Sequence, residues 1–182
     1  MRLLWMLLTA VALFAAERSG PFLEAGAGVG TYDDDGRLAD IDSLNVLQVR
    51  AGAGAFINRH FSVALEYAQF EAFEGTTQAL EASRQYFRMF TADVAAHYPL
   101  FEEKLDLFAK FGAGEIFWDQ KEPVNLNSSS AVLVYGAGIG VRPVSWLTFN
   151  LGYDFYAFEM DTGEASYDMN LGSAYLDLQV QF

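Results

Sequence analysis

Apolar and polar side chains alternate along the last segment of the chain, "LGSAYLDLQVQF". Successive side chains of a β-strand point to opposite faces, so the alternation predicts a strand with one apolar face. The strand continues to an aromatic terminal residue, with no polar tail after it. The residues on its apolar face are Phe182, Val180, Leu178, Leu176 and Ala174.

Seven further segments alternate in the same way: 21–32, 44–57, 61–70, 85–98, 105–118, 131–142 and 147–158. Each reaches the roughly 9–11 residues of a tilted transmembrane strand, and beyond the N-terminus no stretch approaches the roughly 20 apolar residues of a transmembrane helix. The segment 85–98 is the weakest, because Arg88 lies on its apolar face and 78–90 also fits a helix. We expect Arg88 at a membrane interface, where its long side chain can reach water.

The connections between these segments alternate in length. Residues 58–60, 99–104 and 143–146 are short, whereas 33–43, 71–84, 119–130 and 159–169 are long and polar. Outer-membrane barrels show this asymmetry, with short periplasmic turns and longer extracellular loops. The pattern therefore predicts an all-β fold, an eight-stranded antiparallel up-and-down transmembrane β-barrel. A soluble ligand-binding barrel is the alternative, although it has no reason to sort its loops by length.

Aromatic residues concentrate near the predicted strand ends, as expected of two girdles at the membrane interfaces. On the long-loop side they are Tyr32, Phe73, Tyr86, Phe117, Trp118, Tyr156 and Phe158, and on the short-turn side Phe61, Tyr98, Phe101, Trp146 and Phe182.

The N-terminus has the features of an export signal. Arg2 precedes the apolar stretch 3–14, and the small residues Ala15 and Ala16 come before a polar segment. We expect cleavage after Ala15 or Ala16, giving a signal peptide at 1–16 and a barrel at 17–182. A buried helix or a membrane anchor is the alternative.

Taken together, the signal sequence, the alternating strands, the loop asymmetry and the terminal "YLDLQVQF" resemble the small eight-stranded outer-membrane proteins of Gram-negative bacteria, the group of the OmpA membrane domain and OmpX. The resemblance implies a monomer in the bacterial outer membrane with both termini periplasmic. It implies contacts with lipid, lipopolysaccharide and the outer-membrane assembly machinery. That machinery would read the C-terminal strand as its signal, through Phe182, Val180, Leu178 and Leu176.

Charge and composition argue against several other classes of protein. The formal net charge is -13, which argues against nucleic-acid binding, and the 15% aromatic content argues against a disordered chain. The absence of cysteine excludes disulfides and thiolate metal sites, and we expect no cofactor and no metal.

Ionisable residues of both signs fall on the predicted inward faces. An eight-stranded barrel is just wide enough for side chains to fill, so these charges should pair into a plug. Arg50 and Lys110 are the expected cationic centres, and Glu66, Asp93 and Asp154 their expected partners. A gated polar path or a proton relay is the alternative. The predicted charge network is Glu24, Arg50, Glu66, Asp93, Lys110, Arg142, Asp154 and Asp177, and Asp106 also falls on an inward face.

Glycines occupy every second residue, and so successive inward positions, in "GAGVG" (26–30) and "GAGIG" (136–140). Neither segment completes the G-x-G-x-x-G dinucleotide pattern. We therefore expect these glycines to leave room for large side chains that cross the lumen.

Signals for catalysis are weak. Neither G-x-S-x-G nor H-E-x-x-H occurs, and we expect His97 to be a satisfied interior residue near Asp93, with His60 in a short turn. The predicted role is structural or surface-interacting, through four acidic loops, with a plugged lumen. The alternatives are a narrow channel for ions or small solutes and, less favoured, a lipid A-modifying enzyme.

The loop 33–43 contains five Asp and one Arg. It lacks the ligand spacing of a calcium loop, so it predicts either a solvated rim or weak cation binding that bridges to lipopolysaccharide. The residues of this possible site are Asp33, Asp34, Asp35, Asp40 and Asp42.

Overall fold

The computed structural model describes residues 18–33, 39–41, 45–77, 82–121, 126–161 and 166–182. The predicted signal peptide, 1–16, lies outside these ranges. In the part of the chain described, regular structure consists of β-strands alone. No helix there has the length and apolar character needed to cross a membrane.

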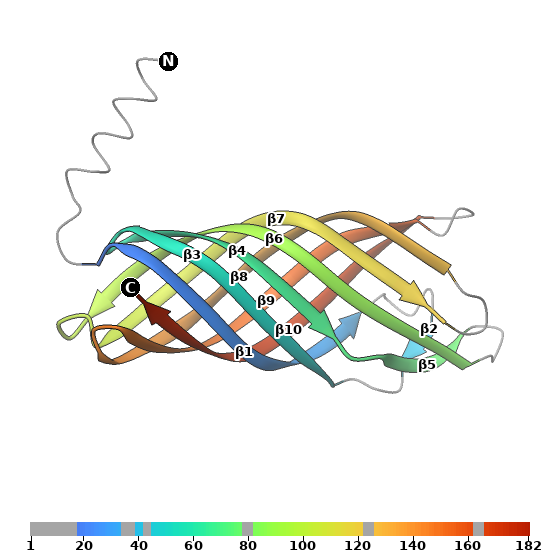
Figure 1. Ribbon diagram of the computed structural model, residues 1–182. Coiled ribbons are helices and arrows are strands. Elements are labelled where there is room, and N and C mark those ends of the chain that lie inside the picture. The colour runs from blue at the N-terminus through green and yellow to red at the C-terminus, as the bar shows by residue number, and fades with distance from the viewer. Residues whose placement is uncertain (1–17, 34–38, 42–44, 78–81, 122–125, 162–165) are drawn as a thin grey trace, which may run out of the picture.

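All strand pairs are antiparallel, and together they close a barrel (Figure 1). Neighbours follow the order β2-β5-β6-β4-β3-β1-β10-β9-β8-β7, and pairing of β6 with β7 completes the ring. The strands are β1 (Gly20–Asp33), β2 (Ala39–Ile41), β3 (Val46–Asn58), β4 (Phe61–Phe70), β5 (Phe73–Thr77), β6 (Ala82–Leu100), β7 (Leu105–Gln120), β8 (Leu126–Val144), β9 (Leu147–Asp161) and β10 (Ser166–Gln181).

Among the described residues these ten strands occupy eight positions around the barrel wall. β4 and β5 both pair with β6 and act as one interrupted strand, and the short β2 pairs only with β5. The predicted eight-stranded antiparallel barrel is thus confirmed.

The barrel has two unlike ends (Figure 1). At the turn end lie the tight turns 59–60, 101–104 and 145–146, together with the start of β1 and the end of β10. At the opposite loop end, the strands continue into what the sequence predicted as long loops. Residues 73–77, 82–84, 119–120, 126–130, 159–161 and 166–169 are all strand, so the prediction of loops over 71–84, 119–130 and 159–169 was wrong for much of their length.

A belt of apolar side chains faces outward around the middle of the barrel. Leu65 is 67% exposed, Leu151 60% and Phe111 60%, which would be costly in water but is expected against hydrocarbon. The outward faces are those that the alternation predicted. Closure leaves no free strand edge, so the backbone within this belt finds its hydrogen-bond partners inside the wall.

The polarity of the wall reverses along the strands. In the turn-end half of β6, Val94 faces out and Asp93 faces in. In the loop-end half of the same strand, Arg88 faces out and Phe87 faces in. β10 repeats the change, because its loop-end part directs Met169 inward and the exposed Asp168 outward. Nineteen residues of β6 far exceed the roughly 9–11 that cross a membrane, so its loop-end part projects beyond the bilayer and follows the rule of a soluble barrel.

This reversal corrects the predicted aromatic girdle on the long-loop side. Tyr32, Phe73, Trp118, Tyr156 and Phe158 point into the barrel and are at most 6% exposed, and only Tyr86 and Phe117 keep the outer side. The inward residues pack with others into a buried apolar cluster, called the loop-end core below. Its members are Tyr32, Val46, Ala68, Phe70, Phe73, Phe87, Met89, Ile116, Trp118, Val132, Val134, Tyr156, Phe158, Met160, Met169 and Leu171.

The seam between the first and last strands ends at the C-terminal aromatic. β1 and β10 pair from Phe22↔Gln181 onward, and the Phe182 backbone N–H donates to the Pro21 carbonyl at 2.9 Å. The Phe182 side chain is 71% exposed on the outer rim of the turn end. An aromatic side chain suits that position if the rim meets the membrane interface.

The loop-end core predicts that two phenylalanines of β6, the buried Phe87 and the outward-facing Phe90, contribute differently to the free energy of unfolding. Phe87→Ala removes a fully buried ring and should lower the free energy of unfolding by about 3–5 kcal/mol, since a cavity remains. Phe90→Ala removes a lipid-facing ring whose space lipid can fill, so only the transfer term of about 1–2 kcal/mol should be lost. Urea unfolding of both variants in vesicles measures the difference, and equal losses would contradict the inward placement of Phe87.

Candidate functional site

The turn-end half of the lumen carries the chain's buried charges, and glycines make the space for them. Gly26, Gly112 and Gly136 stand directly opposite Asp177, Asp93 and Asp154 in the neighbouring strands. A Cβ at each glycine would collide with the facing carboxylate. The glycines of "GAGVG" and "GAGIG" thus do what the sequence predicted, because they let side chains lie flat against the wall of a narrow lumen.

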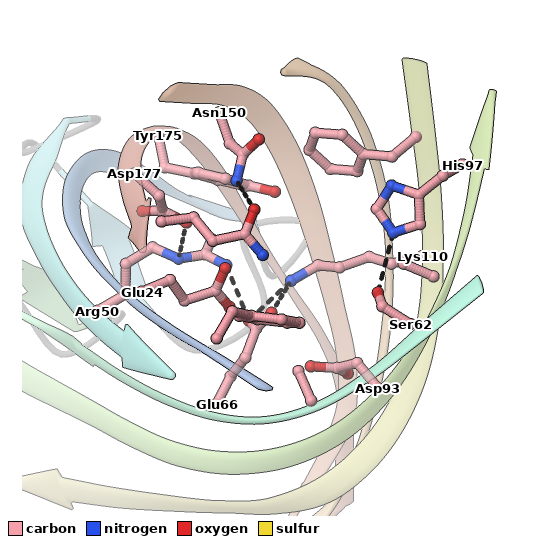
Figure 2. Close-up of a pocket in the computed structure, with 15 residues that line it drawn as sticks. Glu24, Arg50, Ser62, Glu66, Asp93, His97, Lys110, Asn150, Tyr175 and Asp177 are labelled. Atoms are coloured by element: carbon pink, nitrogen blue, oxygen red, sulfur yellow. Dashed lines mark hydrogen bonds and ion pairs between the residues drawn. The ribbon is translucent and has the colours of Figure 1, made fainter. Parts of the chain in front are cut away.

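Arg50 is the centre of the interior ion pairs (Figure 2). Its guanidinium lies 2.8 Å from Glu66 and 3.0 Å from Asp177. It lies 2.8 Å from Asp154 as well. It also lies over the Tyr175 ring, 3.6 Å from the ring centroid. The planar guanidinium can serve several carboxylates at once, so one side chain of β3 joins β4, β9 and β10.

Lys110 completes the cluster from β7. Its Nζ lies 2.7 Å from Glu66 (Figure 2). It also lies 2.8 Å from Asp154, so both carboxylates are shared with Arg50. We call Arg50, Glu66, Lys110, Asp154 and Asp177 the central charge cluster. Its ion pairs connect strands across the lumen, where exclusion of water makes an unpaired charge costly.

The other predicted members of the network lie differently. Glu24 and Asp93 line the same space, but no ion pair within the described residues joins either to a cation. Asp93 Oδ2 instead accepts a hydrogen bond from Thr91 Oγ1 at 3.0 Å. The expected pairing of Asp93 with Arg50 or Lys110 is therefore absent.

Arg142 was predicted in the lumen network but lies at the turn end. It pairs with Glu103 at 3.0 Å and donates to the Ser145 carbonyl and to Gln181 Oε1. It thereby joins two tight turns to the C-terminal strand. The turn it holds contains three consecutive residues with positive φ, at 101–103, a conformation that L-residues adopt at a cost.

A further interior layer, the mouth layer, fills the turn end. It consists of Phe22, Phe56, His97, Phe108, Asp106 and Arg18. The Phe56 ring packs against Phe22 at 5.2 Å and against His97 at 5.0 Å between centroids. These side chains come from β1, β3, β6 and β7 and from the segment before β1.

The sequence placed His97 near Asp93, and the structure corrects this. His97 Nδ1 lies 2.7 Å from Asp106 Oδ2, and His97 Nε2 lies 2.9 Å from Ser62 Oγ. All three residues face inward near the turn end of their strands. Their contacts could therefore be predicted once the strand register is known. Sequence alone did not predict them, because His97 and Asp106 lie on opposite sides of a turn whose length sets their alignment.

Between the mouth layer and the central charge cluster lies a cavity of about 40 Å³. That is room for roughly three water molecules. Above the cluster, Gln48 accepts a hydrogen bond from Ser173 and reaches the Tyr156 hydroxyl at 3.4 Å. The loop-end core follows directly, so within the described residues the lumen holds the mouth layer, this cavity, the central charge cluster and the loop-end core in succession.

Other predicted positions fall outside this region. Arg88 lies on the outer surface and pairs with Asp119 at 3.0 Å, with half of its side chain exposed. Of the proposed cation loop, Asp34, Asp35 and Asp42 lie outside the described residues, and the description of Asp33 and Asp40 covers only their backbone.

The closed antiparallel wall and the apolar outer belt define a small transmembrane barrel. The chain belongs to the outer membrane protein β-barrel domain family, whose model matches residues 2–182. It is thus an outer-membrane barrel of bacterial type.

Solved structures agree on the fold. Neisserial surface protein A has a TM-score of 0.71 at 12% identity, with 92% of this chain and 100% of that chain covered. Ail of Yersinia pestis has a TM-score of 0.62 at 18% identity over 92% and 100%. OprG of Pseudomonas aeruginosa has a TM-score of 0.56 at 10% identity over 92% and 98%. No curated protein matches the chain by sequence.

The central charge cluster predicts that Asp→Asn substitutions at two lumen positions lower the free energy of unfolding by different amounts. Asp154→Asn weakens contacts to both Arg50 and Lys110 and should lower the free energy of unfolding by about 3 kcal/mol or more. Asp93→Asn retains an acceptor for Thr91 and loses no ion pair, so its loss should stay below about 1 kcal/mol. Urea unfolding at neutral pH compares the two, and a larger loss for Asp93→Asn would refute this assignment of the cluster.

Proposed function

We propose that this protein is a closed outer-membrane scaffold with a structural or surface-interaction role, acting through its loop end. The observation that carries the proposal is the reversal of wall polarity. Beyond the lipid-facing belt the strands form a rim with apolar side chains inside and polar ones outside, which is the construction of a stable extramembrane platform. The start of β1 and the end of β10 lie at the opposite end (Figure 1). This platform would therefore face the cell exterior, and the turn end the periplasm.

A channel is the less favoured reading, because two different barriers lie in series. An ion entering from the turn end would have to cross the central charge cluster and then the loop-end core. The core contains six side chains with no exposed surface at all: Phe70, Phe73, Phe87, Ile116, Val134 and Leu171. An apolar constriction excludes water and ions without any need for charge.

Catalysis is disfavoured because the cavity beside the candidate residues is too small for a substrate. Ser62, His97 and Asp106 have the order of a hydrolase triad. Ligand pockets occupy roughly 300–1,000 Å³, whereas the adjoining cavity measures about 40 Å³. Asp106 is also bound by Arg18 through the same oxygen that meets His97. We therefore assign the three residues to packing of the turn end.

The loop end suggests cationic rather than anionic partners. The segment 33–43 has five Asp and one Arg, and 159–169 has four acids and no base. Ail was crystallised with the heparin analogue sucrose octasulfate, a polyanion. The acidic rim of this chain would repel such a ligand unless divalent cations intervened, as they would in a bridge to lipopolysaccharide phosphates.

Single-channel recording tests the closed lumen. The refolded protein should show no discrete openings in a planar bilayer, and Arg50→Ala should remain silent because the loop-end core persists. Arg50→Ala combined with Phe87→Ala should leak, since both barriers are then weakened. Steady openings of the unmodified protein would replace the scaffold proposal with the channel.

Calorimetry tests the acidic rim. Binding of lipopolysaccharide should require magnesium and should weaken about tenfold or more when Asp33, Asp34, Asp35, Asp40 and Asp42 are all changed to Asn, because charge pairing drives it. Glu102→Gln, an exposed acid at the turn end, is the matched control and should bind as the unmodified protein does. Binding that ignores magnesium would exclude this partner.

A further inference from the structure

Arg18 is a buried cation in a place where a frayed terminus is expected. It precedes β1 by two positions, yet it is only 2% exposed. Its Nη1 lies 2.5 Å from Asp106 Oδ2, and its guanidinium lies over the Phe56 ring, 3.8 Å from the centroid. Chain ends are usually poorly ordered unless they are tied down, so these contacts have a structural purpose.

The ion pair crosses the mouth of the barrel. Around the ring the strands run β1, β3, β4, β6, β7, β8, β9, β10, so β7, which carries Asp106, is diametrically opposite β1. The Arg18 side chain therefore extends from beside the β1–β10 seam into the mouth, where it meets the Asp106 side chain that projects from the opposite strand. On its way it covers Phe56, which itself packs on His97.

The backbone beside Arg18 is anchored to the seam. Gln181 Nε2 donates to the Ser19 carbonyl at 3.0 Å, and the Phe182 N–H donates to Pro21. These bonds hold the backbone at Ser19 and Pro21 at the rim whether or not the arginine is inserted. The side chain, by contrast, is held in the mouth by one ion pair and one cation–π contact.

We propose that Arg18 is a stopper that closes the turn-end mouth of the lumen separately from the loop-end core. When it is withdrawn, the space beneath it, lined by His97, Ser62 and Ala64, opens to solvent from the turn end only. The barrel then has a one-sided polar vestibule and still conducts nothing. If the signal is cleaved after Ala15 or Ala16, the stopper is the third or second residue of the mature chain.

Thiol accessibility tests this directly, because the chain has no cysteine and a single introduced one reports alone. The reporter is Ala64→Cys, which lines the cavity but takes no part in the ion pairs. A charged methanethiosulfonate reagent should label it slowly in the otherwise unmodified mature protein. Arg18→Ala should raise the rate about tenfold or more, since breaking a buried ion pair shifts a local opening by at least that factor.

Four further measurements make the result decisive. Arg59→Ala removes an exposed arginine from a turn at the same end and should leave the labelling rate unchanged. Asp106→Asn should raise the rate as Arg18→Ala does, because it removes the other half of the ion pair. In oriented vesicles, reagent supplied only at the loop end should label none of the variants, and urea midpoints identify any variant that is globally unfolded.

The proposal is overturned if Arg18→Ala leaves the labelling rate of Ala64→Cys at the unmodified level. It is also overturned if that variant opens the lumen to the loop-end reagent or to ions in a planar bilayer, since the mouth would then not be a separate closure. A rise for Arg59→Ala equal to that for Arg18→Ala would show general loosening of the turn end, and would reject the stopper too.

Discussion

Everything in this barrel depends on closure of the backbone hydrogen-bond ladder. Within hydrocarbon an unpaired N–H or C=O has no water to bind, so the first and last strands must meet. The β1–β10 seam satisfies this from Phe22↔Gln181 to Asp33↔Asn170. Once the ring is closed, each strand has a lipid face and a lumen face, and every residue is assigned to one of them by parity alone. The apolar belt and the buried charges are two consequences of that single constraint.

A closed ring this small leaves a lumen that side chains must fill. The chain fills it in layers of different chemistry: the mouth layer, the central charge cluster and the loop-end core. The charges are tolerable because Arg50 and Lys110 share Glu66 and Asp154, and because glycines opposite the carboxylates give them room. The layers also differ in what holds them together: ion pairs join the central charge cluster, and apolar packing joins the loop-end core.

Register decides most of what the sequence left open. Parity correctly assigned Asp106 and His97 to the lumen, but their contact depends on the length and left-handed conformation of the 101–104 turn. Arg142 has inward parity as well, yet it lies so close to its turn that it binds Glu103 and Ser145 rather than the central cluster. Arg18 belongs to no predicted strand, so no pattern placed it in the mouth.

The sequence by itself determined the fold, the faces of the strands and the presence of charged side chains in the lumen, because a period of two in hydrophobicity is a local property that any closed membrane sheet must obey. Only the tertiary structure decided which charges meet, where Arg18 and Arg142 lie, and where the wall changes its polarity. The rule of apolar outside and polar inside holds only within the bilayer. Beyond it, water lies outside and Phe87, Trp118 and Met160 must turn inward, so the same alternation carries the opposite meaning.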